Sequence, residues 1–285
     1  MNKGFAISGM IYSILILFLL ILFGLLSVMG ARKMILDKLK NDVITELNYD
    51  ITQIEPSVPE SVSFAEDSWE TIAAIVKSGK ADQYYNVGDT KEVALDGYTN
   101  GSESTFTVRI ANMSTPEECL TEGFSQTACG FVVEFVDIIT EQVMNSTQTS
   151  VGGWPASELY DFVNEDLYST LPIELKNVII NTYVVSGYSS EDYFVSNDKF
   201  YLLSPREIYN SQNDLDANKS RQLDYYKNNN VTTSNYSGEI KLYQGVETSW
   251  WLRSASIYGT FDYVNGGPDS DASYSEYGVA PAFRI

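Results

Sequence analysis

The 285-residue chain has no histidine and only two cysteines. Histidine is the commonest general base, the commonest transition-metal ligand and the usual partner of a serine or cysteine nucleophile, so active sites of these kinds are disfavoured. Two cysteines without histidine cannot make a tetrahedral zinc site. We therefore expect a protein that is not an enzyme and that has no catalytic residues, no metal centre and no cofactor.

Basic residues are also scarce, with 18 Lys and Arg against 38 Asp and Glu. Beyond residue 40 the imbalance is stronger, because 13 basic residues face 37 acidic ones, a net charge of −24. Nucleic-acid binding needs a basic patch that neutralises phosphates, so this partner class is disfavoured. The charge favours solubility and mutual repulsion on a crowded surface.

One long apolar run stands near the start of the chain, with no charged residue between Lys3 and Arg32. About 20 apolar residues cross a hydrocarbon core of roughly 30 Å, and a cleaved secretory signal has a shorter apolar core. The run therefore predicts a transmembrane helix over residues 5–30. Apolar residues at helical spacing continue it as an amphipathic stalk over residues 31–48.

Two prolines, Pro56 and Pro59, predict a linker over residues 49–62, followed by one acidic head over residues 63–285. The basic residues after the apolar run would place the head in the cytoplasm by the positive-inside tendency. The head's composition and its cysteine pair favour the opposite side. We expect a single-pass protein of the cell membrane with an extracellular head.

The first residues resemble a type IV prepilin, in which a short basic leader is removed between Gly and Phe. The resemblance implies a leader over residues 1–4, processing between Gly4 and Phe5, and self-assembly of a cell-surface filament through the amino-terminal helix. Gly9 stands where that family usually has Glu, a departure that bears on filament assembly. The alternative is an uncleaved signal anchor.

Cys119 and Cys129 lie near the ends of a polar segment between two predicted strands. They predict a disulfide that closes the segment, which an oxidising exterior would preserve. The alternative is a pair of reduced surface thiols.

The head alternates between strand and helix patterns. Phe106, Val108 and Ile110 alternate with polar residues as in a strand, and Asp67 is expected to cap a helix. Residues 210–238 and 266–278 are polar and predict surface loops. The expected fold class is α+β, with the long membrane-spanning helix followed by a mixed, mainly antiparallel sheet domain with two to four helices.

From about residue 65 to residue 285 the chain resembles a domain family of unassigned function from surface proteins of Gram-positive and gut bacteria. The residues that carry the resemblance include Trp69, Val87-Gly88-Asp89, Gly152-Gly153-Trp154, Leu202-Leu203-Ser204, Trp250-Trp251-Leu252-Arg253-Ser254 and Gly278-Val279-Ala280-Pro281-Ala282-Phe283. The order of elements is similar to the C-type-lectin-like fold. The signature residues Trp250, Leu252, Ala282 and Phe283 are expected in the core.

The stretch 254–278 is rich in Tyr, Ser, Asp, Asn and Gly, a composition typical of adaptable binding loops. Asp214 and Asp269 each begin a run with the alternating oxygens of a calcium loop, but both runs lack its obligatory Gly and bidentate Glu, so calcium is a weak alternative. The chain is thus expected to bind an extracellular glycan or protein, or alternatively to form pilin-like filaments or to act as a lectin-like receptor diversified by a retroelement. The predicted ligand-binding residues are Tyr258, Asp262, Tyr263, Asn265, Asp269, Asp271, Tyr274 and Tyr277.

Overall fold

A computed structural model describes residues 58–99, 101, 104–188, 192–210, 218–236 and 238–285. It also describes residues 16–18, 32, 34–36 and 38, which are helical. The chain divides into two compact units, Met1–Ser57 and Val58–Ile285, and the second unit contains all the elements described below.

The membrane-spanning helix is the main correction to the expected fold class. No helix among the described residues is long and apolar enough to cross a membrane. Helix α2 (Trp69–Lys77) has nine residues, whereas a span needs about 20. Gly4, Phe5 and most of residues 6–57 lie outside the described residues. The structure supports a mixed α/β, mostly sheet fold.

Helix α2 begins one residue later than the sequence predicted. Its N-cap is Ser68, whose hydroxyl accepts a hydrogen bond from the Thr71 N–H, and Asp67 does not cap it. The Asp67 carboxylate instead accepts hydrogen bonds from the Val62 N–H at 2.9 Å and the Tyr85 hydroxyl at 2.7 Å. Asp67 therefore fastens the preceding turn to the domain.

The first large sheet has four strands in the order β1-β2-β3-β13, all antiparallel. Strand β2 buries the expected alternating residues Val108 and Ile110. Every residue of β3 is buried, as expected for a central strand covered on both faces. The strands are β1 (Thr90–Ala94), β2 (Thr105–Asn112), β3 (Val132–Phe135) and β13 (Ala282–Arg284).

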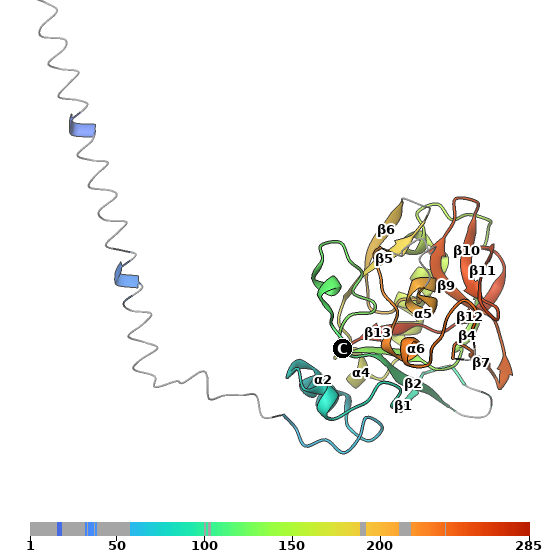
Figure 1. The fold of residues 1–285 in the computed structure, drawn as a ribbon, viewed down its shortest axis with the longest axis horizontal. Helices are drawn as coiled ribbons and strands as arrows, with labels where there is room; N and C mark the ends of the chain where they lie inside the picture. The colour runs from blue at the N-terminus through green and yellow to red at the C-terminus, as the bar shows by residue number, and fades with distance from the viewer. Residues whose placement is uncertain are drawn as a thin grey trace, which may run out of the picture. The chain divides into compact units, whose positions relative to one another are not determined.

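The second large sheet has five strands in the order β11-β10-β9-β12-β4. The orange and red strands β9, β10 and β11 lie side by side in Figure 1. In this sheet β9 and β12 are parallel, and Gly278 of β12 pairs with Trp250 of β9. A Cβ at position 278 would lie 2.4 Å from Ile138 Cδ1, so only glycine fits there. The strands are β4 (Thr140–Val143), β9 (Trp250–Ala255), β10 (Thr260–Val264), β11 (Pro268–Ala272) and β12 (Glu276–Val279).

Short helices and two small hairpins complete the described part of the head. The helical elements are η2 (Ala81–Gln83), η3 (Glu117–Leu120), η4 (Trp154–Ala156), α3 (Glu158–Asp161), η5 (Phe162–Leu167), α4 (Ile173–Lys176), α5 (Pro205–Tyr209) and α6 (Asp224–Asn228). The hairpins are formed by β5 (Thr182–Gly187) with β6 (Tyr193–Asp198), and by β7 (Leu242–Tyr243) with β8 (Val246–Glu247).

Two of the predicted loops contain regular structure. The polar stretch 210–238 contains α6, whose Tyr226 is fully buried. The stretch 266–278 contains β11 and most of β12. Both elements are short and polar, and tertiary contacts stabilise them in the absence of a hydrophobic pattern. The expected core residues Trp250, Leu252, Ala282 and Phe283 are buried.

A cluster of charges around Glu134 of β3 lies inside the protein. Arg109 donates to one oxygen of Glu134 at 2.8 Å, while Lys241 at 3.1 Å and the Tyr226 hydroxyl at 2.9 Å donate to the other. Burial raises the pKa of Glu134, but the positive charges of Arg109 and Lys241 outweigh burial and hold the pKa below its ordinary value. The cluster joins β2, β3, α6 and the segment before β7.

A second buried ion pair fixes β9 to α5. Arg253 makes two hydrogen bonds of 2.6 Å to the Glu207 carboxylate, a bidentate pair. Glu207 also closes the capping box of α5, since its side chain accepts the Ser204 N–H at 3.0 Å. The one carboxylate therefore both starts a helix and neutralises a buried cation.

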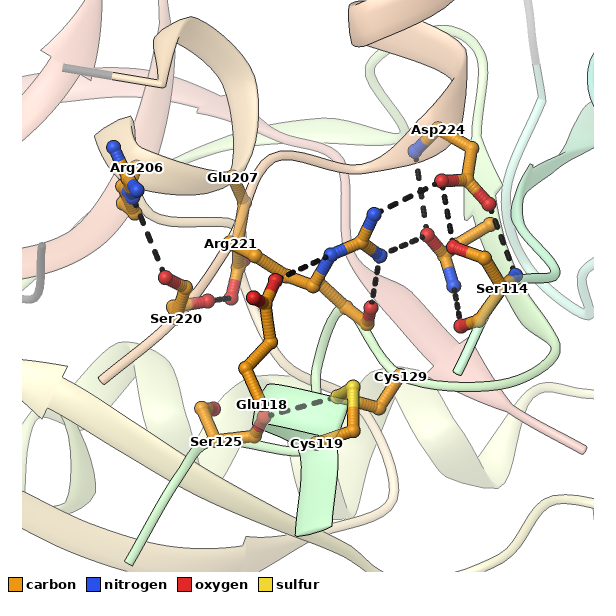
Figure 2. Close-up of polar contacts among 12 residues, drawn as sticks. Ser114, Glu118, Cys119, Ser125, Cys129, Arg206, Glu207, Ser220, Arg221 and Asp224 are labelled. Atoms are coloured by element: carbon orange, nitrogen blue, oxygen red, sulfur yellow. Dashed lines mark hydrogen bonds and ion pairs between the residues drawn. A yellow bond between two sulfur atoms is a disulfide. The ribbon is translucent and has the colours of Figure 1, made fainter. Parts of the chain in front are cut away.

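The predicted disulfide is present between Cys119 and Cys129, with the two Cα atoms 5.9 Å apart. These cysteines and Phe124 form a small buried cluster apart from the main core. Figure 2 shows the disulfide close to Arg221, which pairs with Glu118 at 3.2 Å and Asp224 at 3.1 Å. The disulfide loop is thus tied by one arginine to the start of α6.

Removing the negative charge of Glu134 should destabilise the fold. Glu134→Gln leaves the buried cations Arg109 and Lys241 without a counter-charge, and we expect a loss of about 3–5 kcal/mol in the free energy of unfolding, measured by urea denaturation. Glu92→Gln on the exposed side of β1 is the control, expected to stay within about 0.5 kcal/mol of the wild type. Equal losses in the two variants would contradict this account.

Removing the disulfide should weaken the head but leave it folded, because its cluster is separate from the main core. The double variant Cys119→Ser/Cys129→Ser should lose about 3 kcal/mol of stability on the loop-entropy model and keep its near-ultraviolet circular dichroism. Dithiothreitol should lower the wild-type melting temperature and leave the variant unchanged. Thiols that react with iodoacetamide in the native protein would show that the disulfide does not form.

Candidate functional site

The eight predicted ligand-binding residues all lie on or beside strands β10, β11 and β12, but they do not form one site. Tyr258 and Tyr274 are exposed on turns. Tyr263, Tyr277, Asp269 and Asp271 meet on the sheet. Asn265 lies at the β10–β11 turn, and Asp262 is half-buried within β10.

Three loops that are distant in sequence are fastened together at the end of β9. The Ser150 hydroxyl donates to the Ser256 carbonyl at 2.5 Å and accepts from the Gly259 N–H at 3.2 Å. The Ser273 N–H donates to the Gly259 carbonyl at 3.1 Å, and its hydroxyl donates to the Thr147 carbonyl at 2.9 Å. Loop 145–151, turn 256–259 and turn 272–275 therefore hold one another in place.

These three loops carry four large side chains that are each more than half exposed: Val151, Ile257, Tyr258 and Tyr274. We call these four residues the loop surface. Single exposed apolar residues are normal on proteins, but four on mutually bonded loops make these loops a candidate binding surface. Sequence reasoning found the two tyrosines and missed Ile257 and Val151. Ile257 lies within the Tyr-rich stretch 254–278, and Val151 lies outside it.

The second group is a cluster of aromatic rings and carboxylates on the five-stranded sheet. The rings of Tyr263 and Tyr277 are stacked with centroids 4.3 Å apart, and Trp251 meets Tyr277 edge-on at 4.8 Å. The Tyr277 hydroxyl donates to Asp271 at 2.8 Å, and this bond lowers the pKa of Asp271. Because Trp251 and Tyr263 are buried, this cluster stabilises the sheet more than it offers rings to a ligand.

A cavity of about 270 Å³ lies at the opposite end of β9 and β10 from the loop surface. Predicted residue Asn265 lines it, and the Ser249 hydroxyl donates to the Asn265 side-chain oxygen at 3.3 Å. The cavity is also lined by Glu239, Lys241 and Trp250. Sequence reasoning missed Glu239 and Lys241, since they stand in a polar segment without a recognisable motif.

Glu239 is a buried carboxylate on the wall of this cavity. Burial raises its pKa to about 7, although the nearby Tyr209 hydroxyl and Gly267 N–H act in the opposite direction. Burial likewise lowers the pKa of Lys241 to about 8, with the charge of Glu134 opposing the shift. Buried titratable groups with shifted pKa values beside a cavity are typical of functional sites.

The calcium-like run that begins at Asp269 does not form a calcium loop. Asp269 and Asp271 lie on the extended strand β11, and the two carboxylates accept hydrogen bonds from tyrosine hydroxyls. Asp214 lies outside the described residues. Within the described ranges, no group of three or more Cys, Asp and Glu residues could hold a metal ion.

A family model described as a domain of unknown function (DUF6273) matches residues 133–285. The chain belongs to this family. The DUF6273 match includes both ends of the Glu207–Arg253 pair, the loop surface and the cavity, but it begins after β1, β2 and the disulfide. The resemblance read from the sequence began earlier, near residue 65. No curated protein and no solved structure matches the chain. The C-type-lectin-like part of the expected fold is not confirmed.

The shifted pKa of Glu239 predicts a pH-dependent stability. The folded state keeps the Glu239 proton up to about pH 7, whereas the ordinary value is 4.5, so the folded state binds more protons between these values. The stabilisation from Glu239 is complete below pH 4.5 and is lost as the pH rises through 7. Glu239→Gln should remove this part of the slope, measured as the difference between wild-type and variant unfolding free energies from pH 4.5 to 8. A difference that does not vary with pH would rule out the shift.

Proposed function

We propose that this DUF6273 head is a binding domain that recognises an extracellular protein through its loop surface. The observation that supports this proposal is the mutual hydrogen bonding of the three loops that carry Val151, Ile257, Tyr258 and Tyr274. Loops that are already ordered lose little conformational entropy on binding. Tyrosine adds a large contact area at low entropic cost.

A protein partner fits this surface better than a glycan does. The three aromatic rings of the cluster on the five-stranded sheet, Trp251, Tyr263 and Tyr277, pack against one another, and two of them are buried, so they do not present an open face for stacking on a sugar. Exposed aliphatic side chains such as Val151 and Ile257 gain most from an apolar partner surface. A glycan is the second candidate, favoured by the separate cavity beside Asn265.

The disulfide between Cys119 and Cys129 supports an extracellular location of the head, because disulfides persist mainly in oxidising compartments. The strong negative charge of the head supports the same location, since an acidic head would stay soluble and repel its neighbours on a crowded cell surface.

Two alternatives remain predictions. The pilin-like filament subunit depends on processing between Gly4 and Phe5, which lie outside the described residues. The diversified receptor would vary all eight predicted positions. Tyr258 and Tyr274 are exposed, so the fold should tolerate other residues at these two positions. Tyr263 is buried, and replacing it would disturb its stacking with Tyr277.

The loop surface can be tested with an array of bacterial and host surface proteins, and a glycan array in parallel, using the full-length chain. Tyr258→Ala and Tyr274→Ala should each weaken binding to any captured protein by about tenfold or more, as truncation of a central aromatic contact does. Tyr84→Ala, a partly exposed tyrosine in another part of the head, is the matched control and should bind like the wild type.

Capture of glycans alone, or protein binding that is equal in all three variants, would overturn the proposal. Circular dichroism of each variant establishes that the fold is intact.

A further inference from the structure

Arg284 of strand β13 carries a positive charge that no described carboxylate neutralises. Three other arginines of the head each form an ion pair with a carboxylate, namely Arg109, Arg221 and Arg253. Within the described part of the chain the Arg284 guanidinium makes no ion pair and no hydrogen bond, and its Nε–H is buried without a partner. Burial lowers the pKa of Arg284, while Tyr201 acts in the opposite direction. A half-buried cation without an anion costs desolvation energy, so it calls for an explanation.

Arg284 lines a pocket of about 530 Å³, which we call the Arg284 pocket. Figure 1 shows the end of the chain beside α2, and residues of both line the pocket. Only the Nε of the guanidinium is enclosed by protein, so a ligand in the pocket can reach the two terminal nitrogens. The apolar part of the wall includes Val76, Met113 and Phe131.

A second donor lies close to the guanidinium, at the loop before β3. A Cβ placed on Gly130 would lie 3.1 Å from Arg284 Nη2 and 3.8 Å from Thr115 Oγ1, so both groups are close to one point. Glycine leaves this point open, and its φ of 73° favours glycine here. Thr115 is exposed, and its hydroxyl makes no hydrogen bond with any residue that the structure describes. The pocket therefore offers a guanidinium and a hydroxyl to the same ligand atom or group.

The chemistry of the wall favours a singly charged anion. A guanidinium binds the planar carboxylate group through two parallel hydrogen bonds. Asp82 and Asp224 also line the pocket, and Asp224 is already paired with Arg221, so the pocket has one cation to offer and would repel a doubly charged group such as phosphate. The apolar wall residues gain contact with a hydrocarbon group.

We propose that the Arg284 pocket binds a monocarboxylate that carries an apolar group. The carboxylate lies on the terminal nitrogens of Arg284 and the Thr115 hydroxyl, and the apolar group lies against the wall of Val76, Met113 and Phe131. The volume of about 530 Å³ is within the usual range for ligand pockets, about 300–1,000 Å³. No residue of the loop surface lines this pocket, so the proposal does not depend on the proposed protein binding.

The experiment measures dissociation constants for the full-length chain at neutral pH by ligand-observed NMR. The probes are hexanoate, 3-phenylpropanoate and N-acetylleucine, each compared with its primary amide, together with acetate and inorganic phosphate. Because the amide has the same shape without the charge, at least one acid should bind about tenfold or more tightly than its amide. Acetate lacks the apolar group and should bind more weakly than that acid.

The variants assign the binding to the pocket. Arg284→Met keeps the apolar stem and should remove the preference for the acid over its amide, a change that a general loss of packing would not produce. Thr115→Val should weaken binding of the acid by about threefold or more. Lys227→Met removes the same charge from an exposed position on α6 and should bind like the wild type.

Thr115 is exposed, so its variant keeps the test decisive even if Arg284→Met impairs folding. The absence of binding by every acid would overturn the proposal and leave water as the partner of the guanidinium. Equal binding of the acids and their amides would overturn it too, as would tighter binding of phosphate than of the acids. Unchanged binding of the acid by Thr115→Val and Arg284→Met would place it elsewhere on the protein and overturn the proposal as well.

Discussion

The buried carboxylate of Glu134 is the constraint on which the rest of the head depends. It lies on the central strand β3 and meets Arg109 and Lys241, which come from segments 25 and 107 residues away in sequence. Two cations can be buried there only because one anion accepts from both, and the Tyr226 hydroxyl donates to the same carboxylate oxygen as Lys241. The position of Lys241 then fixes the segment that carries Glu239, and so the wall of the cavity.

This dependence crosses the boundary of the DUF6273 match. Glu134 and Lys241 lie within residues 133–285, but Arg109 lies on β2 before them. Strand β2, which lies before the match, is also hydrogen-bonded to β3 in the four-stranded sheet. Residues 133–285 alone would therefore lack Arg109, one of the two cations that neutralise Glu134. Residues 58–132 belong to the same compact unit. By contrast, the Arg253–Glu207 pair lies wholly inside the match.

Local chemistry made part of this structure predictable. Ser204 and Glu207 have capping-box spacing, and the alternation around Val108 follows directly from strand geometry. The cavity could not be found in the same way, because the burial of Glu239 depends on contacts between segments that no short pattern encodes. The grouped tyrosines were recognised by composition, but composition does not reveal that Tyr263 is buried in the sheet while Tyr258 is exposed.

Strand β11 forms one edge of the five-stranded sheet, and its sequence is Pro-Asp-Ser-Asp-Ala. An unpaired edge offers backbone groups to which another chain can add a strand, and proline and charged side chains oppose such pairing. Two acidic side chains and one proline in five residues therefore protect the molecule against edge-to-edge aggregation. Many copies can consequently be held close together without their sheets joining, and any partner must use side chains in place of backbone pairing at this edge.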